Sequence, residues 1–492
     1  MTTTQALTRL SLESVTRLDP AARPLVEPRS LQPRILHFGL GAFHRAHQAV
    51  YTEAANAVTG EHWGIVDVEP FSSRAVEGMR AQDCLYSVTD RAPGDLRTRV
   101  VGSVVEAVLL NEDPSRVRTL LTDPELATVT LTVTEKGYHR RLDTGSLDTT
   151  AAPIQTDLAA TVTEEAPLTT VLGQLSAGLR ARFHSTGAPI DLISCDNMAG
   201  NGPALAAVVR GFIEASAWTD KDALLSWMTH AVSFPATIVD RIVPATTDED
   251  RDLASSALGL RDDVPVLGEP YRQWVLEDAF VGPRPLWNHD GALYVPDVAP
   301  YQLMKLRLLN GSHSAMAYLG LAAGCRTVAD VLTTDWGEAL VREFGGEVAP
   351  TLPKAGTDPA AYVEDLVVRF RNPAMRHLLR QIGSDGTLKL PERWFGPLRE
   401  LRALGRPSPV LELALAAWVH ATAPTADGGQ RYGTTDPAAP TLASCWSGTM
   451  APTQRVAALL TAAGAEDLAA ATDLTTAIAQ RLDAVSAGKV EL

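Results

Sequence analysis

The spacing of apolar residues changes near residue 300, and this change divides the chain into two predicted domains. Before it, short apolar runs end in polar residues. Buried strands of a parallel sheet have this pattern, and their carboxyl ends bring polar side chains to one edge. The runs are RILHFG (34–39), WGIVDVE (63–69), LATVTLTV (126–133) and PIDLISCDN (189–197). We therefore predict an α/β domain with a parallel sheet for residues 1–297, in which residues 1–33 form a polar leading arm.

After residue 300, alanine and leucine recur at helical spacing and β-branched clusters are rare. This pattern predicts a mostly α-helical C-terminal domain for residues 298–492. The helical stretches that we expect are 314–332, 360–383, 409–421 and 453–487. In the same domain, the run SDGTLKLPERW (384–394) is interpreted as a polar loop from which Lys389 reaches the substrate pocket, with a surface lysine as the alternative.

The run KLRLLNGSH (305–313) places three polar side chains at the start of the helical domain. In a regular helix each residue turns by about 100°, so His313 lies about 80° and Asn310 about 140° from Lys305. Asn-Gly is also a strong hairpin signal. However, the flanking sequence has no period of two, and apolar residues recur at helical spacing after the glycine. We therefore predict a helix, with a solvated lysine beside a turn as the alternative.

The three side chains suit proton transfer at a carbon–oxygen bond. A lysine has a reference pKa of about 10.4 and is a poor base in water. In a dry pocket the charged amine is disfavoured, so we expect the pKa of Lys305 to fall and its amine to exchange a proton near neutral pH. Asn310 and His313 would then donate to, or orient, an oxygen whose charge changes during the reaction.

A glycine-containing turn follows the first predicted strand and leads into a helix. Glycines in this position let the backbone turn tightly and approach a pyrophosphate, as in a Rossmann-type dinucleotide-binding unit. The third glycine of the usual pattern is replaced by His44, and tight turns and methyltransferases have similar sequences. The cofactor contacts predicted in this stretch are Gly39, Gly41, Phe43 and Arg45.

The end of the second predicted strand carries two acids, Asp67 and Glu69. An acid at this point commonly accepts hydrogen bonds from the adenosine ribose hydroxyls of NAD. We assign this contact to Asp67, and the choice between the two acids stays open. Arg74 lies just beyond and suits a 2′-phosphate, so NADP remains an alternative coenzyme.

The later strands of the first domain also end in polar residues. Glu135, Lys136 and Asn197 are expected to line the ligand crevice at the sheet edge, with strand caps or salt bridges as the alternative. Asp240 and Arg241 interrupt an apolar run, so they must be paired or lie at a cleft.

Composition narrows the class of protein. The net charge of −15 argues against nucleic acid or an anionic membrane as a partner, although it allows a small anionic substrate. Four widely spaced cysteines form no C-x-x-C pair, so we expect neither a metal site nor a disulfide framework. No apolar run reaches the roughly 20 residues of a membrane span, and the first residues do not read as a secretion signal. A cytoplasmic enzyme is the expectation.

Five separated blocks together resemble the mannitol dehydrogenase family, the polyol-specific long-chain dehydrogenases. The resemblance implies a Rossmann-type domain, a helical C-terminal domain, no metal, hydride transfer with NAD or NADP, and often a monomer. It implies that Lys305 is the catalytic base, that Asn197 and Asn310 stabilise an oxyanion, and that His313 orients the substrate. It also implies substrate contacts at Val239, Asp240 and Lys389. The blocks are GLGAFHRAHQ (39–48), TVTEKGY (132–138), SCDN (194–197), VDRI (239–242) and KLRLLNGSH (305–313).

Two branches of the family differ in substrate. One oxidises mannitol to fructose, and the other, the D-mannonate oxidoreductases or fructuronate reductases, interconverts D-mannonate and D-fructuronate. The runs IVDRIVPATT and RFRNPAMRH resemble the mannonate branch more closely. Lys389 or Arg369 would then meet the substrate carboxylate. A methyltransferase and a non-catalytic NADH sensor are the alternatives from other classes, and neither requires the set of Lys305, Asn310 and His313.

Overall fold

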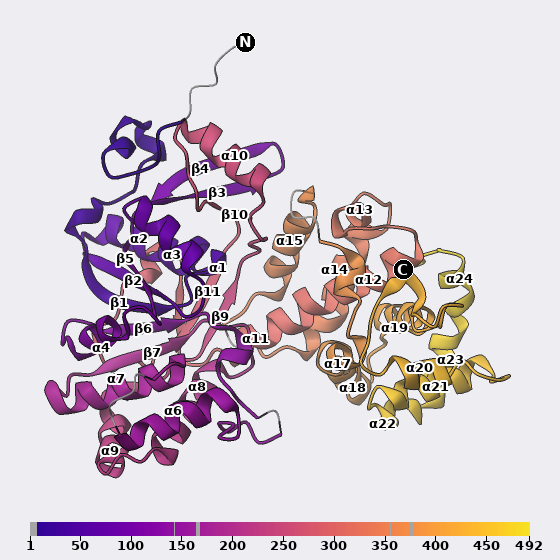
Figure 1. Cartoon of the computed structure of the whole chain (residues 1–492). Helices are drawn as coiled ribbons and strands as arrows, with labels where there is room; N and C mark the ends of the chain where they lie inside the picture. The colour runs from indigo at the N-terminus through magenta and orange to yellow at the C-terminus, as the bar shows by residue number, and fades with distance from the viewer. Residues whose placement is uncertain (1–6, 142, 164–167, 355, 374–376) are drawn as a thin grey trace. The chain divides into compact units, whose positions relative to one another are not determined.

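The computed structural model describes residues 7–141, 143–163, 168–354, 356–373 and 377–492. It divides into two compact units, Met1–Val298 and Ala299–Leu492 (Figure 1). Part of the run RFRNPAMRH, residues 374–376, lies outside the described residues.

The first unit contains a six-stranded parallel sheet. Its spatial order is β5-β2-β1-β6-β7-β8, which is 3-2-1-4-5-6 when these six strands are numbered along the chain. This is the order of the doubly wound dinucleotide-binding fold, and its topological switch point lies between β1 and β6. The predicted Rossmann-type fold is therefore confirmed. The strands are β1 (Gln32–Phe38), β2 (Trp63–Glu69), β5 (Val104–Leu109), β6 (Thr128–Leu131), β7 (Ile190–Ser194) and β8 (Val232–Ser233).

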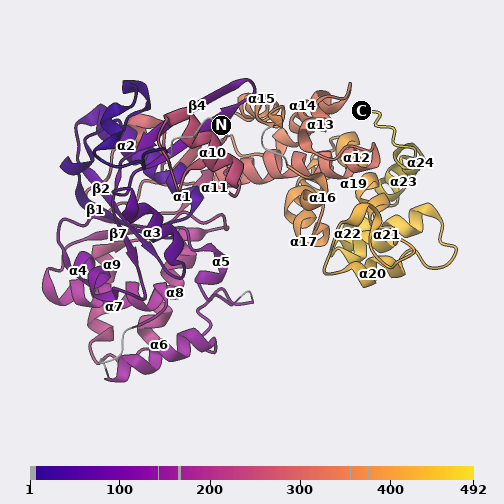
Figure 2. The same cartoon turned by 45° about the horizontal axis from the view of Figure 1, so that its top comes forward.

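Helices cover both faces of this sheet, as the two views show (Figures 1 and 2). Successive side chains of β1 enter different cores: Ile35 belongs to the buried cluster that contains Tyr51 of α2, and Leu36 to the one that contains Leu175 of α7. This explains why the strands are apolar throughout, since both faces are buried. The helices are α1 (Ala42–Ala46), α2 (Gln48–Thr59), α3 (Ser73–Ala81), α4 (Pro114–Thr122), α5 (Thr134–Gly137), α6 (Ala152–Thr163), α7 (Val171–Ser185), α8 (Asn201–Ala215), α9 (Lys221–Ala231) and α10 (Asp248–Leu258).

Two small sheets complete the first unit. One has the order β10-β3-β4 and the other β12-β11-β9. The leading arm packs beside the first of them, because Leu10, Val15 and Leu18 form a buried cluster with Leu85 and Val100. The strands are β3 (Tyr86–Ala92), β4 (Asp95–Val101), β9 (Thr237–Asp240), β10 (Val266–Gly268), β11 (Gln273–Glu277) and β12 (Leu293–Val295).

The second unit is helical in its described residues, as predicted. Its core is built around α12 and α19, which are buried along most of their length. The helices are α11 (Ala299–Met304), α12 (Gly311–Ala322), α13 (Val328–Leu332), α14 (Gly337–Val348), α15 (Pro359–Phe370), α16 (Leu379–Ile382), α17 (Gly386–Leu390), α18 (Gly396–Ala403), α19 (Pro409–Ala421), α20 (Ala439–Ser444), α21 (Pro452–Ala462), α22 (Glu466–Ala469), α23 (Thr472–Gln480) and α24 (Leu482–Ser486).

Two stretches of the second unit are π-helical, with hydrogen bonds between residues five apart. The first π segment (Lys305–Asn310) joins α11 to α12, and the second π segment (Pro391–Phe395) joins α17 to α18. The predicted polar loop at 384–394 is therefore wrong, because most of it is helical. A proline inside a helix lacks an N–H and clashes with the carbonyl four residues earlier. The wider π turn that begins at Pro391 lets the chain stay helical through this residue.

Among the described residues, no helix has both the length and the apolar character that crossing a membrane requires.

Candidate functional site

The turn after β1 lies at the switch point of the sheet. Gly39 has φ +112°, in the region that favours glycine, and its N–H donates to Val68 O at 2.8 Å. A Cβ at this position would lie 2.3 Å from the carbonyl oxygen of Thr132, at the end of β6. Gly39 is therefore required by the fold itself, because the backbone passes too close to the neighbouring strand for any side chain.

Gly41 is different, because the protein leaves space around it. It is exposed, it has ordinary extended backbone angles, and a Cβ there would meet only Gly39 O at 3.9 Å. No described residue therefore requires glycine at this position. A bare backbone just before α1 leaves room for the close approach of a ligand, which is the role predicted for Gly41.

A buried polar network supports the turn from below. His37 Nε2 lies 3.0 Å from Gly39 O, and His37 Nδ1 lies 2.7 Å from the Thr130 hydroxyl. Because a carbonyl only accepts, Nε2 carries the proton and Nδ1 accepts from Thr130. Burial is the main reason that the pKa of His37 lies well below its ordinary value, so the ring is neutral. The Thr132 hydroxyl donates a second bond to Gly39 O at 3.1 Å.

His44 and Asp67 extend this network. The His44 ring stacks on His37 with 3.4 Å between centroids, and its Nε2 lies 3.0 Å from Asp67 Oδ1. Neither side chain of the His44–Asp67 pair is exposed. His37, His44 and Asp67 are close enough to hold a metal ion, but both nitrogens of His37 already have hydrogen-bond partners. The cluster therefore acts as a support for the glycine turn.

This placement corrects the assignment of the ribose contact. Asp67 was predicted to meet the ribose, but its side chain has no exposed surface and faces His44. Its strand neighbour Glu69 is half-buried at the end of β2. Glu69 Oε1 accepts from the N–H groups of Phe71 and Ser72, each at 3.2 Å, which holds the carboxylate at the sheet edge. The structure therefore favours Glu69, the acid that the sequence left open.

The two other residues predicted in this stretch differ in exposure. Phe43 is half-buried and stacks on His47 at 4.9 Å. Arg45 is buried, and its guanidinium donates to Val264 O and lies 5.4 Å from the Tyr86 ring. Its charge is therefore directed into the packing around β3, and the predicted cofactor contact of Arg45 does not agree with this placement. A sequence pattern shows that an arginine follows the turn but not where its side chain packs.

At the ends of β6 and β7, Asp196 connects the two strands. It accepts from the N–H groups of Val133 and Thr134, at 3.2 and 2.8 Å, and from the Tyr138 hydroxyl at 2.7 Å. Burial raises the pKa of this carboxyl group. Sequence reasoning missed its role, although Asp196 stands within the quoted SCDN block. The predicted residues beside it, Glu135, Lys136 and Asn197, are all exposed.

Val239 and Asp240 are buried on β9, which belongs to a small sheet rather than to the six-stranded one. In the antiparallel register, Val239 is opposite Trp274 and Asp240 is opposite Gln273. The next residue, Arg241, is paired as expected for a charge in an apolar run. It donates to Glu269 O at 3.0 Å and to Asp90.

In the second unit, Lys305 and Asn310 open and close the first π segment, and both are half-buried. The Gly311 N–H donates to Leu306 O, five residues earlier. In this geometry residue i+5 lies one turn above residue i, so Asn310 stands closer to Lys305 than the regular helix of the prediction would place it.

His313 lies in the first turn of α12 and faces two rings. Its ring is tilted against Phe370, with 4.5 Å between centroids, and meets His377 edge-on at 5.7 Å. Its Nε2 has no hydrogen-bond partner in the described structure. Burial lowers the pKa of His313 well below its usual value, and the nearby charges of His377, Arg369 and Arg393 lower it further. His313 is therefore a neutral ring near two guanidinium groups, those of Arg369 and Arg393.

Lys389 is held by backbone carbonyls. Its ammonium donates to Ser384 O at 2.7 Å and to Ile382 O at 3.2 Å. Burial lowers its pKa, and the Arg393 charge adds to this effect. It lies on α17 and not on a loop.

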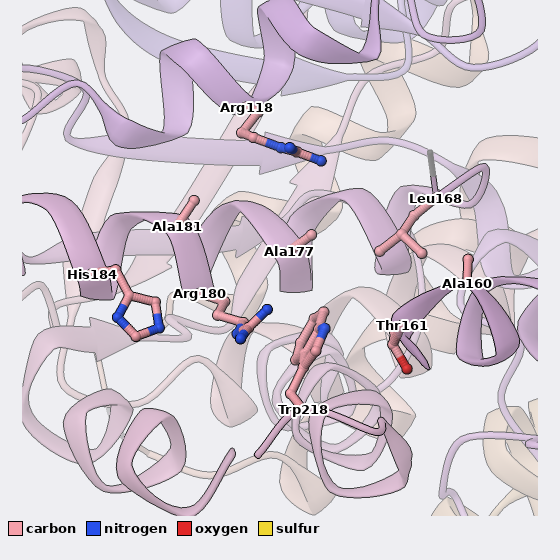
Figure 3. Close-up of a pocket in the computed structure, with 9 residues that line it drawn as sticks. All are labelled: Arg118, Ala160, Thr161, Leu168, Ala177, Arg180, Ala181, His184 and Trp218. Carbon is pink, nitrogen blue, oxygen red and sulfur yellow. The ribbon is translucent and has the colours of Figure 1, made fainter. Parts of the chain in front are cut away.

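A separate pocket of about 160 Å³ lies among α4, α6 and α7 of the first unit (Figure 3). Two of its side chains, Arg180 and His184, are bonded to Asp220, at 2.9 and 2.5 Å. None of the residues predicted for catalysis lines it. The lining residues are Arg118, Ala160, Thr161, Leu168, Ala177, Arg180, Ala181, His184 and Trp218.

Comparison with known families decides between the possible classes of Rossmann-type protein. Residues 33–289 match the mannitol dehydrogenase Rossmann domain, and residues 297–486 match the mannitol dehydrogenase C-terminal domain. The chain belongs to the mannitol dehydrogenase family. It is therefore an oxidoreductase, and the predicted family and enzyme class are confirmed.

Several relatives cover both units. A D-mannonate oxidoreductase of Escherichia coli is 38% identical over 85% of this chain and 86% of its own length. A mannitol 2-dehydrogenase of Pseudomonas fluorescens, solved with NAD and D-mannitol, is 32% identical, with a TM-score of 0.75 and 97% of each chain covered. A substrate-free D-sorbitol dehydrogenase has a TM-score of 0.88 at 28% identity, covering 99% of this chain and 100% of its own. Members of the mannitol dehydrogenase family thus differ in substrate at similar levels of identity.

Proposed function

We propose that this protein interconverts a secondary alcohol and a ketone on a linear sugar derivative with NAD, and that the pair is D-mannonate and D-fructuronate. The observation that carries the proposal is the first π segment, which brings Lys305 and Asn310 onto adjacent turns ahead of His313. An amine and an amide in this relation supply a proton acceptor and a hydrogen-bond donor for one oxygen.

The glycine turn and Glu69 of the first unit suit the binding of a dinucleotide. The turn at Gly39 is forced by Thr132, whereas nothing in the described structure requires glycine at Gly41, so the space there is available to a pyrophosphate. Glu69 is anchored through one oxygen, and its other oxygen is left to accept a ribose hydroxyl. When bound, NAD would accept a hydride from the substrate carbon.

The chain itself supplies proton transfer and charge stabilisation. In the oxidative direction, Lys305 is neutral and accepts the proton of the C5 hydroxyl, while the amide of Asn310 donates to the developing alkoxide. In the reductive direction, the protonated Lys305 returns the proton. A neutral His313 neither competes for this proton nor adds a charge, so its role is to orient a hydroxyl group.

The preference for a sugar acid rests on charge. The charged groups that act on His313 are the guanidinium groups of Arg369 and Arg393, whereas burial lowers the pKa of the neighbouring His377. An aldonate brings a carboxylate that gains from cationic partners, whereas a polyol brings none. Mannitol, the substrate named for other relatives, is the alternative.

A reduction assay tests both parts of the proposal. NADH and NADPH are each offered with fructuronate, tagaturonate and fructose, and kcat/KM is measured for all six combinations. We expect NADH with fructuronate to give the largest value. Comparable kcat/KM for fructose would exclude the sugar-acid preference, and no reduction of any ketone would exclude the proposed activity.

A further inference from the structure

We propose that Arg393 and Trp394 are positioning residues that hold the first π segment in its register. They lie on the second π segment, which packs against the first. The inference rests on the proposed function only for the roles of Lys305 and Asn310. The register itself is a structural property, and amide exchange at residues 305–311 reports on it without an activity assay.

The two side chains donate to the backbone at the end of the first π segment. Arg393 Nη1 donates to Asn310 O at 3.3 Å and to the Ser314 hydroxyl oxygen at 2.9 Å. The buried Trp394 Nε1 donates to Gly311 O at 3.0 Å. Asn310 and Gly311 are the junction between π and α geometry, so both donors act at the point where the register changes.

Close packing fixes the junction from other directions. A Cβ on Gly311 would lie 2.9 Å from the Phe344 ring and 3.5 Å from Arg393 O, so the helix fits here only as glycine. The Trp394 ring meets Tyr318 of α12 edge-on at 6.0 Å. The donors are therefore not free to follow the junction if it moves.

Within the first π segment, Arg307 is also anchored. Its guanidinium donates to both carboxylate oxygens of Glu400 on α18, at 2.8 and 2.6 Å, and to Thr351 O at 2.6 Å. The segment is thus held at its middle by Arg307 and at its end by Arg393 and Trp394. Pro391 starts the second π segment and so sets the direction of the two donors that follow it.

The register determines the geometry of the candidate site. If the first π segment became α-helical, the residues before the junction would turn by about 100° and shift by about 1.5 Å relative to α12. Lys305 would then lose its relation to Asn310 and His313. A misplacement of about 1 Å in a catalytic group can cost about 100-fold in rate.

Trp394→Phe gives the cleanest test, because it keeps a buried aromatic ring and removes the Nε1 donor, while the loss of ring volume can be matched in a control. Trp418→Phe is the matched control, since Trp418 is buried in the same core on α19. We expect Trp394→Phe to lower kcat about 10-fold or more, to leave KM for NADH within about twofold, and to speed amide exchange in the peptide that covers residues 305–311. Trp418→Phe is expected to change none of these.

Arg393→Met and Arg393→Lys separate position from charge. Met removes both hydrogen bonds and the charge, whereas Lys keeps the charge and a single donor nitrogen. We expect kcat to fall in Arg393→Met and to recover in part in Arg393→Lys. If Arg393→Met does not fold, the comparison of Trp394→Phe with Trp418→Phe still tests the inference.

Three results identify different failures. Normal kcat in Trp394→Phe with a lower Tm would show a structural role only and overturn the inference. Unchanged amide exchange at 305–311 in both Trp394→Phe and Arg393→Lys would also overturn it. Normal turnover of Lys305→Ala would instead overturn the proposed function, while the exchange measurement would still report on the register.

Discussion

The glycine turn of the first unit and the first π segment of the second unit are both irregular stretches of backbone, but they are held in different ways. The turn is fixed by covalent and steric limits, because Gly39 meets Thr132 and no side chain fits. The π segment is fixed by donors from a distant part of the chain, Arg393 and Trp394. Irregular geometry can thus come from a residue type or from a tertiary contact, and only the first is visible in a sequence.

The two regions should therefore fail in different ways. Damage to the glycine turn strains the fold and the nucleotide site, so nucleotide affinity and stability should fall together. Damage to the π segment should leave nucleotide affinity intact and reduce turnover. Nucleotide affinity and turnover can be measured separately, so the two responses can be told apart.

The largest effect is expected for Lys305→Ala. Loss of a general base usually costs about 100 to 10,000-fold in rate, so kcat should fall in this range. Binding of NADH, measured by fluorescence titration, should stay unchanged because the proposed nucleotide contacts lie in the other unit. Lys354→Ala is the control, since Lys354 is an exposed lysine of the second unit. Retention of more than about one tenth of kcat in Lys305→Ala would mean that the π segment does not carry the base.

Gly39→Ala should show the opposite response. Alanine must adopt a left-handed angle, which costs about 1–3 kcal/mol, and its Cβ would meet Thr132 O. We expect NADH affinity to fall about 10 to 100-fold and Tm to fall as well. Gly60→Ala is the matched control, because Gly60 also has positive φ (+73°) but a Cβ there meets nothing within 4 Å. Equal effects of the two substitutions would show that the contact with Thr132 is unimportant.

The sequence was sufficient for the parts of the fold that depend on local pattern. Apolar runs with polar ends predicted β1, β2, β6 and β7, and helical spacing predicted the second unit. The glycine spacing predicted the turn at Gly39. These features follow from residue type and periodicity, which are properties of short stretches.

The remaining features depend on contacts between distant residues. Nothing local distinguishes Asp67, which faces the buried His44, from Glu69 two residues later at the strand end. Arg45 follows the glycine turn in sequence but packs toward Val264. The π register of Lys305 depends on residues about 90 positions later, and the stretch that contains them was predicted as a loop because of its proline and polar residues.

Glu69→Gln sharpens the description of the nucleotide region. A hydrogen bond to a charged group is worth about 1.5–3 kcal/mol, so NADH affinity should fall about tenfold or more. Loss of the negative charge should also remove repulsion of a 2′-phosphate, and the ratio of NADPH to NADH activity should rise. Glu77→Gln, an exposed acid on α3, is the control for a general charge effect. A ratio that changes equally in both variants would exclude a specific ribose contact by Glu69.

The smallest effect concerns the pH dependence of stability, and it tests whether the layer behind the glycine turn is dry. His47 is fully buried, its Nε2 donates to Gln273 O at 2.9 Å, and burial lowers its pKa to about 3. In the unfolded chain a histidine has a pKa of about 6.5, so between pH 7.5 and 5.5 the unfolded state gains a proton that the folded state does not.

Acidification over this interval should therefore cost about 1 kcal/mol of unfolding free energy through His47 alone. His47→Gln keeps an N–H donor for Gln273 and should remove this share of the pH dependence, as measured by urea denaturation at the two pH values. His230→Gln, at an exposed position, should leave the pH dependence unchanged. If His47→Gln also left it unchanged, His47 would take up a proton as easily in the folded protein as in water. The layer behind the glycine turn would then be open to water and not dry.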